Sequence, residues 1–150
     1  MRIIVDANIV FSAMLNTNGK IATILSNNAI KCIAPNFLKT EIRKYHKKLA
    51  KSAKLNIDEI QEIEYYIFQH LVFISEEQIE ETYWKKAYDL VKDIDEKDTT
   101  YIAYALKFKC KLWTGDKKLS NGLKKKNQSF TIQTNDLYEL LNSKKIINKN

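Results

Sequence analysis

Short apolar segments alternate with longer segments of helical periodicity along the 150 residues, and this alternation limits the possible folds more than any other feature. The apolar segments lie at residues 2–5, 31–34, 71–74, 111–114 and 130–132. Between them, apolar residues recur every three or four positions, as on the buried face of a helix. Strands that alternate with helices form a parallel sheet covered by helices, because parallel neighbours need long crossover connections. We therefore expect an α/β fold.

Capping residues predict where several of the helices begin. Asn36 would cap a single helix over residues 37–49. Ser75 and Gln78 have the spacing of a capping box at the start of a long helix. We expect one domain over residues 1–143, followed by a polar tail at residues 144–150.

The composition excludes several classes of protein. An apolar content of 45% argues against disorder, and no apolar run is long enough to span a bilayer. Asp6 interrupts the N-terminal apolar run too early for a signal peptide, so we expect a cytoplasmic protein with no membrane partner. The isolated Cys32, Cys110, His46 and His70 do not have the spacing of a structural zinc site.

Positive charge is concentrated in two places. Residues 1–108 carry 15 basic and 15 acidic side chains, whereas residues 109–150 carry ten lysines and three acidic side chains. Within the neutral part, residues 39–54 form a second basic stretch. This segregation suits a polyanionic partner such as nucleic acid. A compositional bias towards lysine would explain it equally well.

Four carboxylates are expected to meet at one edge of the sheet. Asp6 and Asp116 directly follow strands, Asp98 opens the helix before the 111–114 strand, and Glu41 lies early in the helix after the second strand. In open parallel sheets, functional sites lie beyond the carboxyl ends of the strands. Clustered carboxylates repel one another unless a hard cation such as Mg²⁺ or Mn²⁺ lies among them.

Each of these acids also has an ordinary structural explanation. Asp6, Asp98 and Asp116 could each cap the helix that follows. Glu41 could pair with Lys44 on the same helix. The four together, in this order around a parallel sheet, favour a shared site.

The chain also resembles a known family, the PIN domains, over nearly its whole length. Val5-Asp6-Ala7-Asn8 is similar to the opening motif of the family, and Thr40-Glu41 fits its second acidic position. Residues 97–105 are similar to the third motif, an aspartate that leads an alanine-rich helix. Residues 112–117 are similar to the last motif, an apolar strand followed by Thr-x-Asp.

The resemblance implies a three-layer α/β/α fold with a central parallel sheet of about four to five strands. It also implies RNA cleavage that depends on Mg²⁺ or Mn²⁺, with Asp6, Glu41, Asp98 and Asp116 as metal ligands. Asn8 and Thr114 would orient them. Asp95 could be an additional ligand, or it could belong to a solvated loop with Asp93 and Glu96. Small bacterial members often act as the toxin of a toxin–antitoxin pair, usually as homodimers.

We therefore expect an endoribonuclease whose products carry a 5′-phosphate and a 3′-hydroxyl. The residues expected to hold the RNA are Arg43, Lys44, Lys47, Lys117 and Lys118. Trp113 could stack on a base, but its place in an apolar strand favours core packing. The alternatives are a housekeeping RNA-processing or flap nuclease, or a non-catalytic module that binds RNA or protein. An aspartyl-nucleophile phosphohydrolase fits an Asp-x-Asp opening better than Asp6-Ala7-Asn8.

Overall fold

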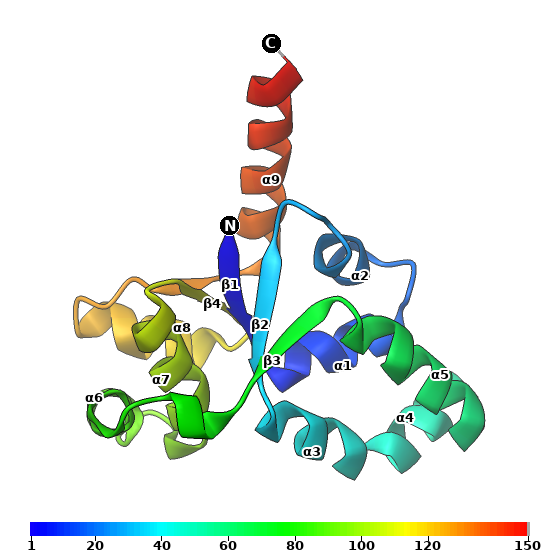
Figure 1. Ribbon diagram of the computed structural model, residues 1–150, viewed down its shortest axis with the longest axis horizontal. Helices are drawn as coiled ribbons and strands as arrows, with labels where there is room; N and C mark the ends of the chain where they lie inside the picture. The colour runs from blue at the N-terminus through cyan, green and yellow to red at the C-terminus, as the bar shows by residue number, and fades with distance from the viewer. Residues whose placement is uncertain (150) are drawn as a thin grey trace.

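A parallel sheet forms the centre of the molecule (Figure 1). The computed structural model describes the backbone of residues 1–149 and the side chains of residues 1–143. Within these residues, five strands pair in the order β3-β2-β1-β4-β5, and every pairing is parallel. The strands are β1 (Arg2–Val5), β2 (Lys31–Pro35), β3 (Leu71–Ile74), β4 (Lys111–Trp113) and β5 (Thr131–Ile132). The α/β class and the number of strands predicted from the sequence are confirmed.

Helices cover both faces of this sheet, so the fold has the three layers expected (Figure 1). One face is covered by α1 (Ala7–Leu15), α2 (Lys20–Leu25), α3 (Phe37–Lys44), α4 (His46–Ala53), α5 (Ile57–Phe68) and the start of α9 (Thr134–Lys149). The other face is covered by α6 (Glu81–Val91), α7 (Thr99–Phe108) and α8 (Lys117–Lys125). Two 3₁₀ turns, η1 (Glu76–Gln78) and η2 (Glu96–Asp98), precede α6 and α7.

The alternation of side chains along the strands produces two hydrophobic cores. In β1, Ile3 and Val5 belong to the core under α1, whereas Ile4 belongs to the core under α7. Successive side chains of a strand point to opposite faces, so a central strand must be apolar at every position. Trp113 of β4 is fully buried, and its indole N–H donates to the hydroxyl of Thr134 at 3.0 Å. This residue therefore packs in the core, as its strand position predicted.

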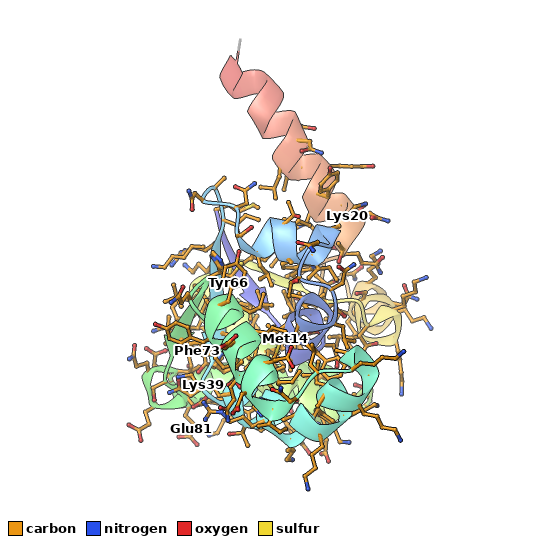
Figure 2. The ribbon with its side chains drawn as sticks, turned by 90° about the vertical axis from the view of Figure 1, so that its right-hand side faces the viewer. Met14, Lys20, Lys39, Tyr66, Phe73 and Glu81 are labelled. Carbon is orange, nitrogen blue, oxygen red and sulfur yellow. The ribbon has the colours of Figure 1, made fainter. Side chains whose placement is uncertain are left out.

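Two helix predictions were wrong. The expected helix over 37–49 is divided at Tyr45, where φ is −104° and ψ is 10°, into α3 and α4. Asn36 makes no side-chain cap, and the backbone N–H of Phe37 donates instead to a carboxylate oxygen of Glu76 at 2.8 Å. Lys39 lies over the ring of Phe73 at 4.2 Å (Figure 2), so β3 and η1 hold α3 in place.

The capping box at Ser75 is also absent. The hydroxyl of Ser75 accepts from the backbone N–H of Glu77 at 3.3 Å, and this contact starts only the 3₁₀ turn η1. The α-helix begins later, after Glu80. Ile79 lies before this helix and is buried at the junction between η1 and α6.

Helix α9 extends away from the body of the molecule (Figures 1 and 2). Its first turns are attached by Leu137 and Leu141, which are buried, and by Lys20, whose ammonium donates to the side-chain oxygen of Asn135 at 3.1 Å. Helical backbone continues to Lys149, across most of the tail expected at residues 144–150, while Asn150 lies outside the described residues. The domain boundary at residue 143 stays a prediction. None of the helices in residues 1–149 is long and apolar enough to cross a membrane.

Candidate functional site

The two central strands bring Asp6 and Asp116 to the same edge of the sheet. β1 and β4 are neighbours, with Val5 paired to Trp113, so the residues that follow them lie side by side. The chain reaches β2 and β3 on one side of β1, and β4 and β5 on the other. This reversal of strand order is where open parallel sheets place their functional sites.

Asp6 and Asp116 both cap the helices that follow them, as the alternative explanation of these two residues predicted. One oxygen of Asp6 accepts from the backbone N–H of Ile9, and one oxygen of Asp116 accepts from the backbone N–H of Leu119, each at 3.0 Å. A cap uses only one of the two oxygens of a carboxylate, so capping does not exclude a second role.

Asp98 differs from these two, because it makes no side-chain cap for α7. Its Oδ2 is buried and has no hydrogen-bond partner among the described residues. A buried carboxylate oxygen without a partner is costly, and it calls for an explanation such as an ion. The capping alternative considered for Asp98 is therefore wrong.

Glu41 reaches the site from α3 and is held there by α7. The hydroxyl of Tyr101, a residue that is 4% exposed, donates to Oε1 of Glu41 at 2.5 Å. The pair with Lys44 that was considered for Glu41 is not formed. This hydrogen bond joins the helices on opposite faces of the sheet across the site.

The four carboxylates line one cavity of about 350 Å³, together with Asp95. Asn8 also lines this cavity, whereas Thr114 is fully buried and does not line it. The hydroxyl of Thr114 accepts from the backbone N–H of Asp116 at 3.1 Å, and its side chain is also hydrogen-bonded to Asp6. Thr114 thus links the two aspartates that follow β1 and β4.

Burial and mutual repulsion disturb the protonation of these acids. The pKa of Asp98 is raised from 3.8 to about 7, first by burial and then by the negative charges of Asp116, Asp95, Asp6 and Glu41. Burial also raises the pKa of Asp6, although the hydrogen bonds from Thr114 and from the backbone N–H of Ile9 oppose the rise. Carboxylates repel one another in this way where no cation neutralises them.

A family comparison decides what kind of domain this is. The model of the PIN domain matches residues 4–138, which include all four carboxylates. The chain belongs to the PIN domain family. This family consists of nucleases, which generally use divalent metal ions.

A solved structure supports the fold of this PIN domain. The chain is similar to one in the crystal structure of VapBC2 from Rickettsia felis bound to a DNA fragment from their promoter. The TM-score is 0.64 at 13% sequence identity, and the match covers 89% of this chain and 98% of that one. A likeness at this identity concerns the fold alone. A comparison with curated protein sequences gave no match.

The carboxylates are the right type of ligand for a divalent ion, but their side chains are not arranged to coordinate one. Oxygen ligands are those that Mg²⁺ and Mn²⁺ prefer, and the unpartnered oxygen of Asp98 is available as one. Among the described residues, however, no three His, Cys, Asp or Glu side chains are arranged to hold a metal ion as they stand. The donor set therefore fits the metal of the family, and binding requires the carboxylates to turn towards one another.

The basic residues expected to hold RNA lie outside this cavity. Arg43 is paired with Glu64 at 3.2 Å and lines a separate cavity with His46. The other four, Lys44, Lys47, Lys117 and Lys118, are exposed and do not line the carboxylate cavity.

Several further cavity residues were not assigned to the site from the sequence. They include Phe11, Tyr45, Lys48, Lys97 and Tyr101. Lys48 and Tyr45 belong to the basic 39–54 stretch, but the break between α3 and α4 decides which of its side chains reach the cavity. No sequence signal identified Glu41 as the hydrogen-bond partner of Tyr101.

Proposed function

We propose that this PIN domain is a metal-dependent endoribonuclease that hydrolyses RNA phosphodiester bonds. The observation that carries the proposal is the meeting of four carboxylates, from four segments of the chain, in one cavity where β1 and β4 end. The unpartnered oxygen of Asp98 and the raised pKa of this residue indicate that the cluster is costly without a cation. A structural role alone would not require this cost.

The ligands would be Asp6, Glu41, Asp98 and Asp116, with Asp95 as a further candidate. Mg²⁺ or Mn²⁺, when bound, supplies Lewis-acid chemistry that activates water and stabilises charge on the scissile phosphate. The protein residues orient this chemistry. The backbone N–H of Ile9 and the side chain of Thr114 fix Asp6, while Tyr101 fixes Glu41.

Hydrolysis would leave a 5′-phosphate and a 3′-hydroxyl on the products. Among the described residues no histidine or cysteine lines the cavity, so the carboxylates, rather than an imidazole or a thiol, would serve the reaction. The exposed Asn8 at the rim would orient Asp6 or the substrate.

The test is cleavage of single-stranded RNA by the purified chain with Mg²⁺, with Mn²⁺ and with a chelator. Asp6→Asn and Asp98→Asn should each lower the rate at least 100-fold. Asparagine is a good N-cap, so Asp6→Asn removes the charge while keeping the cap of α1. Asp89→Asn, on the exposed face of α6, changes the same charge outside the cavity and should keep the wild-type rate.

Two results would remove the proposal. One is cleavage that survives in the folded Asp6→Asn protein, and the other is cleavage that persists in chelator. Sequencing of the product ends would confirm which bond is broken. If the wild type binds RNA without cutting it under any metal, the non-catalytic binding module takes its place.

We further propose that the chain is the toxin of a type II toxin–antitoxin pair and forms a homodimer. The support is the PIN family and the likeness in fold to a chain of the VapBC2 structure. Expression of the chain should arrest growth, and Asp98→Asn should relieve the arrest. Co-expression of a small neighbouring gene should also relieve it, and light scattering should give twice the mass of the chain. Normal growth on expression would favour a housekeeping nuclease.

A further inference from the structure

The carboxylate cavity has an aromatic and basic side that the proposed metal chemistry does not use. Phe11 of α1, Tyr45, Lys48 of α4 and Lys97 of η2 line it together with the acids. At about 350 Å³ the cavity lies at the low end of ligand pockets, and it suits a single nucleotide unit better than a duplex.

Tyr45 presents ring surface to solvent at the rim of this cavity. It lies at the break between α3 and α4, and 49% of the residue is exposed. Its ring meets that of Phe11 at an angle of 79°, with centroids 6.1 Å apart. An edge-to-face pair leaves ring surface uncovered, so Phe11 supports Tyr45 without hiding it. Trp113, the residue that the sequence suggested for stacking, is by contrast fully buried.

Two lysines accompany this ring. Lys48 follows Tyr45 by three residues, one turn along α4, and Lys97 enters the cavity from the loop that carries Asp98. Neither lysine forms an ion pair among residues 1–143, although carboxylates line the same cavity. Their ammonium groups are therefore available to an anionic ligand that enters between them.

We propose that Tyr45 and Lys48 form a nucleotide subsite beside the carboxylates. An unpaired base stacks on the ring of Tyr45, and Lys48 binds the adjoining phosphate, with Lys97 on the opposite side. A base must be unpaired to stack on a side chain, so this subsite selects single-stranded RNA over duplex RNA. The inference deepens the proposed function and rests on RNA being the substrate.

The subsite can be tested by binding, separately from cleavage. The full chain carrying Asp116→Asn, in Mg²⁺, is titrated with a single-stranded RNA that contains 2-aminopurine, whose fluorescence reports stacking. Tyr45→Ala in this background should weaken binding about tenfold and abolish the change in fluorescence. Tyr45→Phe, which keeps the ring, should retain both. Tyr88→Ala is the matched control, because Tyr88 has a similar exposure of 46% on the outer face of α6.

The lysine is tested through the salt dependence of the same binding. Lys48→Gln should weaken binding several-fold and reduce the slope of log K against log salt by about 0.7, the value for one phosphate contact on a single strand. Lys47→Gln removes the same charge from the neighbouring exposed position and should have a smaller effect. If Tyr45→Ala does not fold, as judged by circular dichroism, Tyr45→Leu replaces it, since leucine fills space without an aromatic face.

The outcomes separate the subsite from the nuclease. A folded Tyr45→Ala or Tyr45→Leu protein that binds within twofold of its parent, with the fluorescence change intact, overturns the subsite even if the wild type cleaves RNA. If binding depends on the ring of Tyr45 but the wild type does not cleave RNA in the presence of any metal, the subsite is supported and the nuclease is overturned. A wild type that binds no single-stranded RNA overturns both.

Discussion

At the scale of single residues, hydrogen bonds determine how each acid can serve the site. Asp6 and Asp116 each use one oxygen as a helix cap, whereas Asp98 caps nothing and leaves an oxygen unpartnered. Among the described residues, Glu41 is the one acid of the four that accepts a hydrogen bond from a side chain on another helix, the hydroxyl of Tyr101. Mutation of a group that orients a metal ligand typically lowers metal affinity by about 10- to 100-fold. Tyr101 should therefore act as a positioning residue.

Tyr101→Phe should weaken the binding of Mn²⁺ or Mg²⁺ about tenfold, because Glu41 loses the donor that orients it. Isothermal titration calorimetry of the metal alone measures this effect without RNA. Tyr104→Phe is the control, because Tyr104 lies on the same helix and donates to the carbonyl of Ile74 at 2.6 Å, outside the cavity. Equal metal affinities for the two variants would show that the hydroxyl of Tyr101 has only a structural role.

At the scale of elements, α8 fixes the loop that carries Asp95 and Asp98. Lys126, at the end of α8, donates to the carbonyl of Leu90 at 2.8 Å and pairs with Asp93. Gly122 lies against Ile94 so closely that a Cβ atom there would stand 2.6 Å from Cδ1 and 2.9 Å from Cγ1 of Ile94. A glycine inside a helix costs about 1 kcal/mol relative to alanine, so its presence indicates a packing requirement.

Gly122→Ala should lower the free energy of unfolding by about 1 kcal/mol, because overpacking against Ile94 outweighs the gain in helix propensity. Urea denaturation measures the change. The added substitution Ile94→Val should recover part of the loss, since it removes the Cδ1 atom of closest approach. If Gly122→Ala is more stable than the wild type, Ile94 moves aside without a loss of stability, and the position of the loop does not depend on its contact with α8.

The sequence predicted elements better than it predicted the contacts between them. The apolar strands and the acids after β1 and β4 were predictable, because periodicity and strand ends are local features. The break at Tyr45 was not, since the apolar spacing of Ile42, Tyr45 and Leu49 continues across it. The contact between Tyr101 and Glu41 spans 60 positions and depends on how α3 and α7 cross the sheet.

At the scale of the whole molecule, the carboxylate cluster should make stability depend on pH and on metal together. A carboxyl whose pKa is raised on folding binds more protons in the folded state than in the unfolded state, so stability falls as pH rises between the two values. For Asp98 this window runs from 3.8 to about 7. Exposed Asp93 and Glu80, whose pKa values are lowered by Lys126 and Lys107, act in the opposite direction at more acidic pH.

We expect Asp98→Asn to be more stable than the wild type in chelator at pH 8, by about 1–2 kcal/mol once solvent screening around a partly buried group is allowed for. At pH 5 the difference should be small, because the wild-type carboxyl is then mostly protonated. Thermal denaturation of both proteins across this range measures it, and subtracting one curve from the other cancels the contribution of groups that lie far from Asp98. Saturating Mg²⁺ or Mn²⁺ at pH 8 should reverse the order, since a ligand at about 100 times its dissociation constant adds about 2.7 kcal/mol to the protein that binds it. A wild type that is the more stable of the two in chelator would mean that the acids do not repel one another in solution, and the physical reason for a cation among them would be lost.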